Sequence, residues 1–170
     1  MGITFLTETW LRPSGDEAKC ADLAPPSYSA SSFPRSPGAA SCRGGGIAFI
    51  GRDSLKQNVS CSTSFPFHHF CFEVAQLTLT LHSQRYNFFC IYPPPPPPNK
   101  MNAFTDMFFD QFTRFLEYCD TLSDKVLIIG DFSIHFETLN DQNSIKMHDM
   151  SEIFSLSQSV TEPTHTHGHL

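Results

Sequence analysis

The sequence predicts a layered domain of the α/β or α+β class, in which helices pack against β-sheets. Short runs rich in aromatic and β-branched residues are typical of strands, and a helical repeat of apolar residues lies between two of them. Strands that alternate with helices along the chain favour such layers. The 17 phenylalanines bring the aromatic content to 13%, enough ring area to drive formation of a sizeable core. A length of 170 residues suits a single domain, spanning residues 1–170.

The first third of the chain contains two short strand patterns separated by a polar stretch. The first dozen residues look like the end of a strand that runs into a turn at residues 12–15. Residues 12–45 are rich in Ser, Pro, Gly and Ala, which predicts a long surface excursion. The glycines at 44–46 then lead into a short buried strand at residues 47–50.

A hairpin and a proline run occupy the middle of the chain. Residues 70–81 and 86–92 have strand composition, and residues 82–85 between them are typical of a hairpin turn. The six prolines at 93–98 cannot continue a sheet, so we expect a stiff, extended connector there. A spacer is the plain interpretation of that run, and a ligand for a proline-binding domain is the alternative.

The strongest helix pattern follows the prolines. Apolar residues recur there at three- and four-residue steps, with Asn102 as the expected N-cap; these residues are Phe104, Met107, Phe108, Phe112, Phe115, Leu116 and Cys119. Residues 125–130 form a continuous apolar strand, and residues 144–156 form a weaker amphipathic helix pattern.

The charge of the chain restricts its functions. A net charge of −6, with no cluster of Lys or Arg, argues against a protein that holds nucleic acid by bulk electrostatics. A metal-assisted phosphate enzyme stays compatible with this charge, because the cation itself supplies positive charge. We expect no signal peptide at the start and no membrane partner, since the apolar runs are too short to span a bilayer. The six cysteines contain no C-x-x-C, and we expect reduced thiols, several of them in the core.

Two carboxylates stand at the ends of strand patterns. Asp131 follows the glycine that ends the apolar strand 125–130, so its side chain is expected at the carboxyl end of a central strand, where active sites of layered proteins concentrate. An aspartate that simply opens a turn is the alternative. Glu8 lies in an apolar stretch before a turn, where it either faces solvent or has a partner such as a metal. Two such carboxylates suit Mg²⁺, which prefers oxygen ligands.

Three further sites are candidates for chemistry. Tyr92 closes a strand pattern, where it either packs or donates a hydrogen bond to a phosphate oxygen. His135 lies four residues past Asp131 and either lines the same cleft or belongs to a turn. The histidines between residues 165 and 169 resemble zinc ligands, but they have no partner cysteines at ligand spacing, and fortuitous affinity for metal resin is the alternative.

The order of several short motifs carries a resemblance that covers nearly the whole chain. These motifs are T-E-T-W-L at 7–11, P-P-S-Y-S at 25–29, G-G-G-I-A at 44–48, F-E-V at 72–74, F-F-C-I-Y-P-P at 88–94, V-L-I-I-G-D-F-S-I-H at 126–135 and S-Q-S-V-T-E-P-T-H at 157–165. In this order they resemble the endonuclease domain of LINE-type (non-LTR) retrotransposons. That domain belongs to the endonuclease/exonuclease/phosphatase superfamily, together with apurinic endonucleases and deoxyribonuclease I.

The resemblance implies a deoxyribonuclease-I-like, four-layer sandwich of two packed β-sheets flanked by helices. It also implies Mg²⁺-dependent nicking of DNA, in which water attacks a phosphodiester. Glu8 matches the family's metal-binding glutamate, and Asp131 matches the aspartate that orients or deprotonates the attacking water. Tyr92 matches a tyrosine close to the scissile phosphate. A nuclear location follows only from the function of the parent family.

Departures from the family pattern point to an impaired enzyme. Ser133 replaces an asparagine that helps to hold phosphate and water, and a serine hydroxyl cannot offer the same amide geometry. Pro93 replaces the arginine of the family's Y-R-P-P motif. Family members begin earlier and continue further, so we expect an incomplete domain that lacks its first strand and its C-terminal strands. The two hypotheses are therefore a weak Mg²⁺-dependent DNA endonuclease and, as the alternative, an inactive retrotransposon-derived remnant or protein-interaction module.

Overall fold

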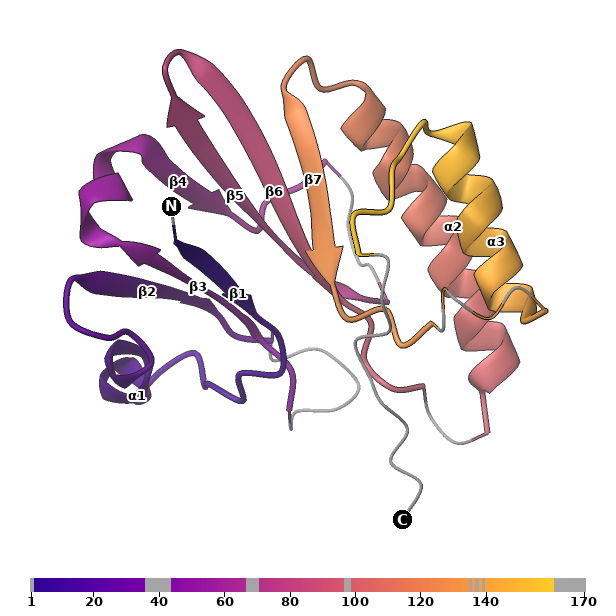
Figure 1. The fold of residues 1–170 in the computed structure, drawn as a ribbon. Helices are drawn as coiled ribbons and strands as arrows, with labels where there is room; N and C mark the ends of the chain where they lie inside the picture. Colours follow the sequence, from indigo (N-terminus) through magenta and orange to yellow (C-terminus); the bar gives the residue numbers. More distant parts are fainter. Residues whose placement is uncertain are drawn as a thin grey trace.

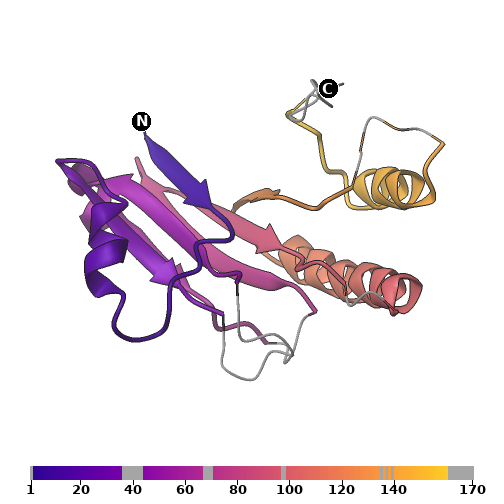
Figure 2. The same ribbon diagram turned by 90° about the horizontal axis from the view of Figure 1, so that it is seen from below.

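Two β-sheets pack face to face, with helices outside both of them, as Figures 1 and 2 show. The computed structural model describes residues 2–35, 44–66, 71–96, 99–134, 136, 138 and 140–160. The first sheet has the order β1 (Ile3–Leu6), β3 (Ile47–Arg52), β2 (Tyr28–Phe33), and the second has the order β4 (Val59–Ser62), β5 (Glu73–Leu81), β6 (Gln84–Tyr92), β7 (Lys125–Gly130).

The helices form the two outer layers. The short helix α1 (Glu17–Asp22) lies outside the first sheet, and α2 (Met101–Asp120) and α3 (Gln142–Ile153) lie outside the second (Figure 1). A 3-10 helix, η1 (Asp53–Asn58), connects β3 to β4. The predicted four-layer order is therefore confirmed. None of the described helices is long and apolar enough to cross a membrane.

A first core fills the space between the two sheets. Because side chains alternate along a strand, each strand contributes every second residue to this layer. Its buried members are Ile47, Phe49, Ala75, Leu77, Leu79 and Cys90. Phe5 and Phe33 pack against Phe49 from the neighbouring strands, with ring centroids 5.1 and 5.3 Å away.

A second core lies between the second sheet and the helices. The apolar face of α2 supplies six buried residues, namely Phe108, Phe109, Phe112, Phe115, Leu116 and Cys119. Phe115 and Phe89 of β6 are both fully buried and meet edge to face, with centroids 5.1 Å apart. Most of the predicted helical repeat therefore faces the sheet, but Met107 is 43% exposed, and Phe109, which the repeat did not include, is buried.

The ends of the two long helices differ from those predicted. Helix α2 begins at Met101 after Lys100, whose side chain makes no capping bond, so Asn102 lies inside the first turn and the expectation that it caps the helix is wrong. Helix α3 begins earlier than expected because the carboxylate of Asp141 accepts hydrogen bonds from the backbone N–H groups of Asn143 and Ser144.

The central hairpin and its crossover set the geometry of the second sheet. Strands β5 and β6 are antiparallel, and the turn between them is only His82-Ser83, with both φ angles positive at 48° and 65°. Such angles match the right-handed twist of the flanking strands. Strand β7 runs parallel to β6 after the crossover through α2. Gly130 is required at its end, since a Cβ there would lie 2.0 Å from the carbonyl oxygen of Ile91.

Three predictions need correction or completion. Strand β7 is not central: it lies at an edge of the described four-stranded sheet. The segment 12–45 is only partly exposed in its described part, and it includes α1 and β2. Strand β2 escaped prediction because its serine-rich sequence is held by backbone pairing with β3 rather than by a buried apolar face. Prolines 93–96 connect β6 to α2 without helix or strand, and 97–98 lie outside the described residues.

Candidate active site

The candidate site lies between the two sheets, at the end where β6 and β7 finish and β5 begins. The register pairs Glu73 with Tyr92 and Ile91 with Gly130, which brings Asp131 level with Tyr92. The alternation of side chains directs Glu73 and Tyr92 to the face that also carries Ala75 and Cys90, towards the first sheet.

Glu8 reaches Tyr92 from the first sheet, where it follows β1. The Tyr92 hydroxyl donates a hydrogen bond to Oε1 of Glu8, which joins residues 84 positions apart in the sequence. Only 4% of Tyr92 is exposed. Burial raises the pKa of the Tyr92 phenol, and the hydrogen bond to Glu8 and the charge of its carboxylate raise the pKa further. The phenol therefore keeps its proton at neutral pH and acts as a hydrogen-bond donor.

Asp131 is exposed and forms a local turn with Ser133. The backbone N–H of Ser133 donates to Oδ1 of Asp131 at 3.0 Å, and Ser133 has a φ of 51°. This geometry is that of an aspartate opening a turn, and it also orients a carboxylate that stays accessible to solvent. His135 lies outside the described residues, as do the histidines between 165 and 169.

A carboxylate that the sequence analysis did not assign lies beside Tyr92. Oε1 of Glu73 accepts a hydrogen bond from Nε of Arg35, and Oε2 accepts one from the backbone N–H of Gly46 at 2.6 Å. The side chains of Arg35 and Glu73 are only 12% and 16% exposed. Some ion pairs of the described residues join segments that are far apart in the sequence. Among these, the Arg35–Glu73 pair is the most buried.

The glycines at 44–46 form the surface on which the site is built. All three have positive φ angles, between 80° and 90°. A Cβ at Gly45 would lie 2.3 Å from both Nη2 of Arg35 and Oε1 of Glu73, so a side chain there would displace this ion pair. The carbonyl of Gly46 accepts from the N–H of Thr9 at 3.2 Å, and that of Gly45 accepts from Trp10 at 2.9 Å.

These bonds orient the segment that carries Glu8. Glu73 holds Gly46, and Gly46 holds Thr9, the residue that follows Glu8. Glu8 has a φ of 53°, a conformation that non-glycine residues adopt only when their surroundings impose it. Oγ1 of Thr9 is the only buried side-chain N or O atom of the described residues that lacks a hydrogen-bond partner. We conclude that the Arg35–Glu73 pair supports the position of Glu8.

The sequence contained a signal for Glu73 but none for Arg35. A charged residue that opens a strand beside the buried Phe72, in the F-E-V motif, indicates a partner nearby. Arg35 lies in a Ser- and Pro-rich stretch, and only the folded chain brings it to Glu73, 38 residues away.

The donor set determines which metals the site fits. No group of three or more His, Cys, Asp or Glu side chains in the described part of the chain is arranged to bind a metal. A structural zinc site, which needs four such ligands, does not fit these residues. Mg²⁺ keeps several waters and commonly uses one or two carboxylates plus substrate phosphate, and Glu8 supplies one carboxylate, so the site fits that ion.

Sequence comparisons do not assign the chain, whereas structural comparison does identify its fold. No protein-family model matches the sequence, and the search of curated proteins gave no match. The structure is similar to that of the AP endonuclease LMAP from Leishmania major, with a TM-score of 0.63 and 13% identity over 88% of this chain and 56% of that one. It is also similar to the human Nocturnin catalytic domain with bound sulfate, with a TM-score of 0.51 and 12% identity over 84% of this chain and 54% of that one.

These likenesses concern the fold. The chain spans just over half the length of each of the two structures. The shared part includes the two packed sheets and flanking helices, although only 12–13% of the residues are identical. The fold of this protein is that of the deoxyribonuclease-I-like sandwich.

Proposed function

We propose that this chain is a nuclease domain that hydrolyses phosphodiesters of DNA with Mg²⁺, of the kind found in LINE-type retrotransposons. The observation that carries the proposal is the meeting of Glu8 and Tyr92 between the sheets, with Asp131 level with Tyr92. The ordered motifs of the sequence and the similarity of the fold to an AP endonuclease support it.

Each residue has a role that its chemistry allows. Glu8 would hold the Mg²⁺ ion, which stabilises charge on a phosphate and makes a bound water more acidic. Asp131, exposed and fixed by the Ser133 N–H, orients or deprotonates the attacking water. Tyr92 keeps its proton and donates its single hydrogen bond to Glu8 in this structure; it would donate that bond to a phosphate oxygen instead once Glu8 turns to the ion.

The activity is expected to be low. Ser133 has a short hydroxyl where the resembled family has an amide, and its positive φ suits asparagine better than serine. The Ser133→Asn variant should therefore nick faster than the wild type, because it restores an amide beside Asp131.

Nicking of supercoiled plasmid tests the proposal. We expect slow nicking that requires Mg²⁺, stops with chelator, and is lost in Asp131→Ala and in Glu8→Ala. The Asp110→Ala variant is the matched control, since Asp110 is an exposed aspartate on α2 that pairs with Arg114 of the same helix. Nicking that survives in Asp131→Ala would contradict the assignment.

One observation favours a second candidate function, an inactive domain that binds another protein. Leu127 lies in the middle of the edge strand β7 and is 41% exposed, and Ile153 at the end of α3 is 73% exposed. Apolar residues on an edge strand are a site for pairing with another chain. A folded protein that nicks no plasmid, with or without Mg²⁺, would favour this candidate.

A further inference from the structure

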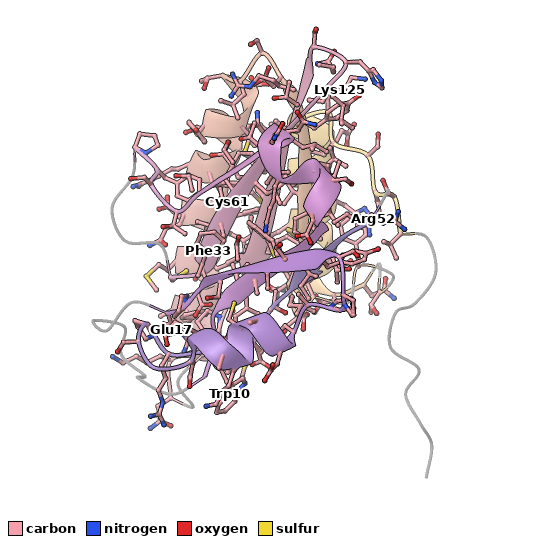
Figure 3. All side chains as sticks on the ribbon, turned by 90° about the vertical axis from the view of Figure 1, so that its left-hand side faces the viewer. Trp10, Glu17, Phe33, Arg52, Cys61 and Lys125 are labelled. Atoms are coloured by element: carbon pink, nitrogen blue, oxygen red, sulfur yellow. The ribbon has the colours of Figure 1, made fainter. Side chains whose placement is uncertain are left out.

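The only tryptophan of the chain, Trp10, stands exposed two residues after Glu8. Its exposed fraction is 64%. An aromatic ring of this size contributes most when it is covered, so such a ring left in water is a candidate contact for a ligand. Trp10 lies at the opposite end of the molecule from Lys125, which opens β7, and so at the end where β7 reaches Asp131 (Figure 3).

The backbone of Trp10 is held in an unusual conformation. Its φ is 56°, in the left-handed region that a bulky side chain rarely adopts. The N–H of Trp10 donates to the carbonyl of Gly45 at 2.9 Å, and the neighbouring Thr9 is held by Gly46. Such strained positions are kept only where the surrounding structure imposes them, and they concentrate at functional sites.

One side of the indole ring rests on Gly44. A Cβ at this glycine would lie 3.4–3.6 Å from three atoms of the ring, at ordinary van der Waals contact, so the ring lies close to Gly44. The ring is therefore oriented before any ligand arrives, which lowers the entropy cost of binding.

The surroundings of Trp10 indicate the kind of ligand. The chain carries a net charge of −6 and cannot hold nucleic acid by bulk charge. Stacking of a base on an aromatic ring requires no net charge and tolerates any base sequence. A base inside a duplex must first be unstacked, whereas an unpaired base is free to stack.

We propose that Trp10 stacks on an unpaired nucleobase of single-stranded DNA, adjacent to a phosphate bound near Glu8 and Tyr92. This inference rests on the proposed function and names the form of its substrate. The domain therefore prefers single-stranded or locally open DNA to closed duplex.

The emission of the single tryptophan tests this inference. We expect a short oligothymidylate to quench Trp10 saturably, in chelator and at low salt, where binding is measured without cleavage. An abasic oligonucleotide of the same length has the same phosphates without bases, and it should bind about tenfold more weakly. Equal binding of the two, or no quenching, would overturn the inference, and tighter binding of oligouridylate would overturn the assignment to DNA.

Variants separate stacking from a general effect on folding. With a labelled oligothymidylate, anisotropy should show about tenfold weaker binding for Trp10→Leu and near-normal binding for Trp10→Phe, which keeps a ring. Ile153→Ala, at the remote end of α3, is the matched control for loss of an exposed apolar residue. Wild-type binding by Trp10→Leu refutes the inference even if plasmid is nicked. Loss of nicking with normal quenching instead refutes only the proposed function.

Discussion

The ion pair between Arg35 and Glu73 provides the sharpest test of how the site is held together. Replacing Arg35 with alanine leaves the carboxylate of Glu73 with the N–H of Gly46, 2.6 Å away, as its remaining partner in the described residues. A charge in this position is poorly solvated, since the Glu73 side chain is only 16% exposed. The Arg35→Ala variant should therefore lose much of its free energy of unfolding.

The size of the loss follows from the burial of the pair. Breaking a fully buried ion pair costs about 3–5 kcal/mol, whereas an exposed pair contributes less than about 1 kcal/mol. With side chains 12% and 16% exposed, the Arg35–Glu73 pair lies closer to the buried limit, and we expect a loss of about 2–3 kcal/mol. At a slope of about 2 kcal/mol per molar urea, the midpoint should fall by about 1–1.5 M.

Equilibrium unfolding in urea, followed by circular dichroism, measures this loss. The matched control is Arg114→Ala, which breaks an exposed pair with Asp110 on α2 and should cost at most about 0.5 kcal/mol. Adding Glu73→Gln to Arg35→Ala should recover about 1 kcal/mol, because the amide is uncharged and its oxygen still accepts from Gly46. If Arg35→Ala costs no more than Arg114→Ala, the ion pair does not support the site.

Two further predictions concern titratable groups. Because burial and Glu8 raise the pKa of Tyr92, the phenol loses its proton at higher pH in the folded than in the unfolded chain. The stability that protonated Tyr92 contributes is therefore complete below about pH 10 and falls as the pH rises further. Urea midpoints across this alkaline range should decrease more steeply for the wild type than for Tyr92→Phe, and parallel decreases would contradict the prediction. Burial also raises the pKa values of Cys90 and Cys119 to about 12. In the native protein, neither thiol should therefore be alkylated before the exposed Cys61, and peptide mass mapping can measure this order.

Local sequence predicted the regular elements well where packing and periodicity agree. The apolar repeat of α2 and the aromatic strands β5 and β6 are read directly from residue types, because one face of each is buried and the other is not. None of the five described cysteines forms a disulfide in the structure, Cys42 lies outside the described residues, and the expectation of reduced thiols stays a prediction. Strand β2 was missed because edge strands are held by backbone bonds, which leave little trace in the sequence.

The carboxylates Glu8 and Asp131 were identifiable from the sequence because each stands where an apolar run ends. Their roles remain predictions, while the contact of Glu8 with Tyr92 is a property of the folded chain. The same is true of Arg35, which no local pattern marks and which pairs with Glu73 from a different part of the chain.

Residue order alone therefore determined the class of the fold, the elements with a strong apolar period, and the candidate carboxylates. The tertiary structure decided how these residues meet, through the register of β5, β6 and β7 and through three glycines that let Trp10, Thr9, Arg35 and Glu73 approach the same backbone. The physical reason is that periodicity and turn chemistry act between near neighbours, whereas a site is assembled by contacts between segments far apart in the chain. Here the sequence separation is 38 residues between Arg35 and Glu73 and 84 residues between Glu8 and Tyr92.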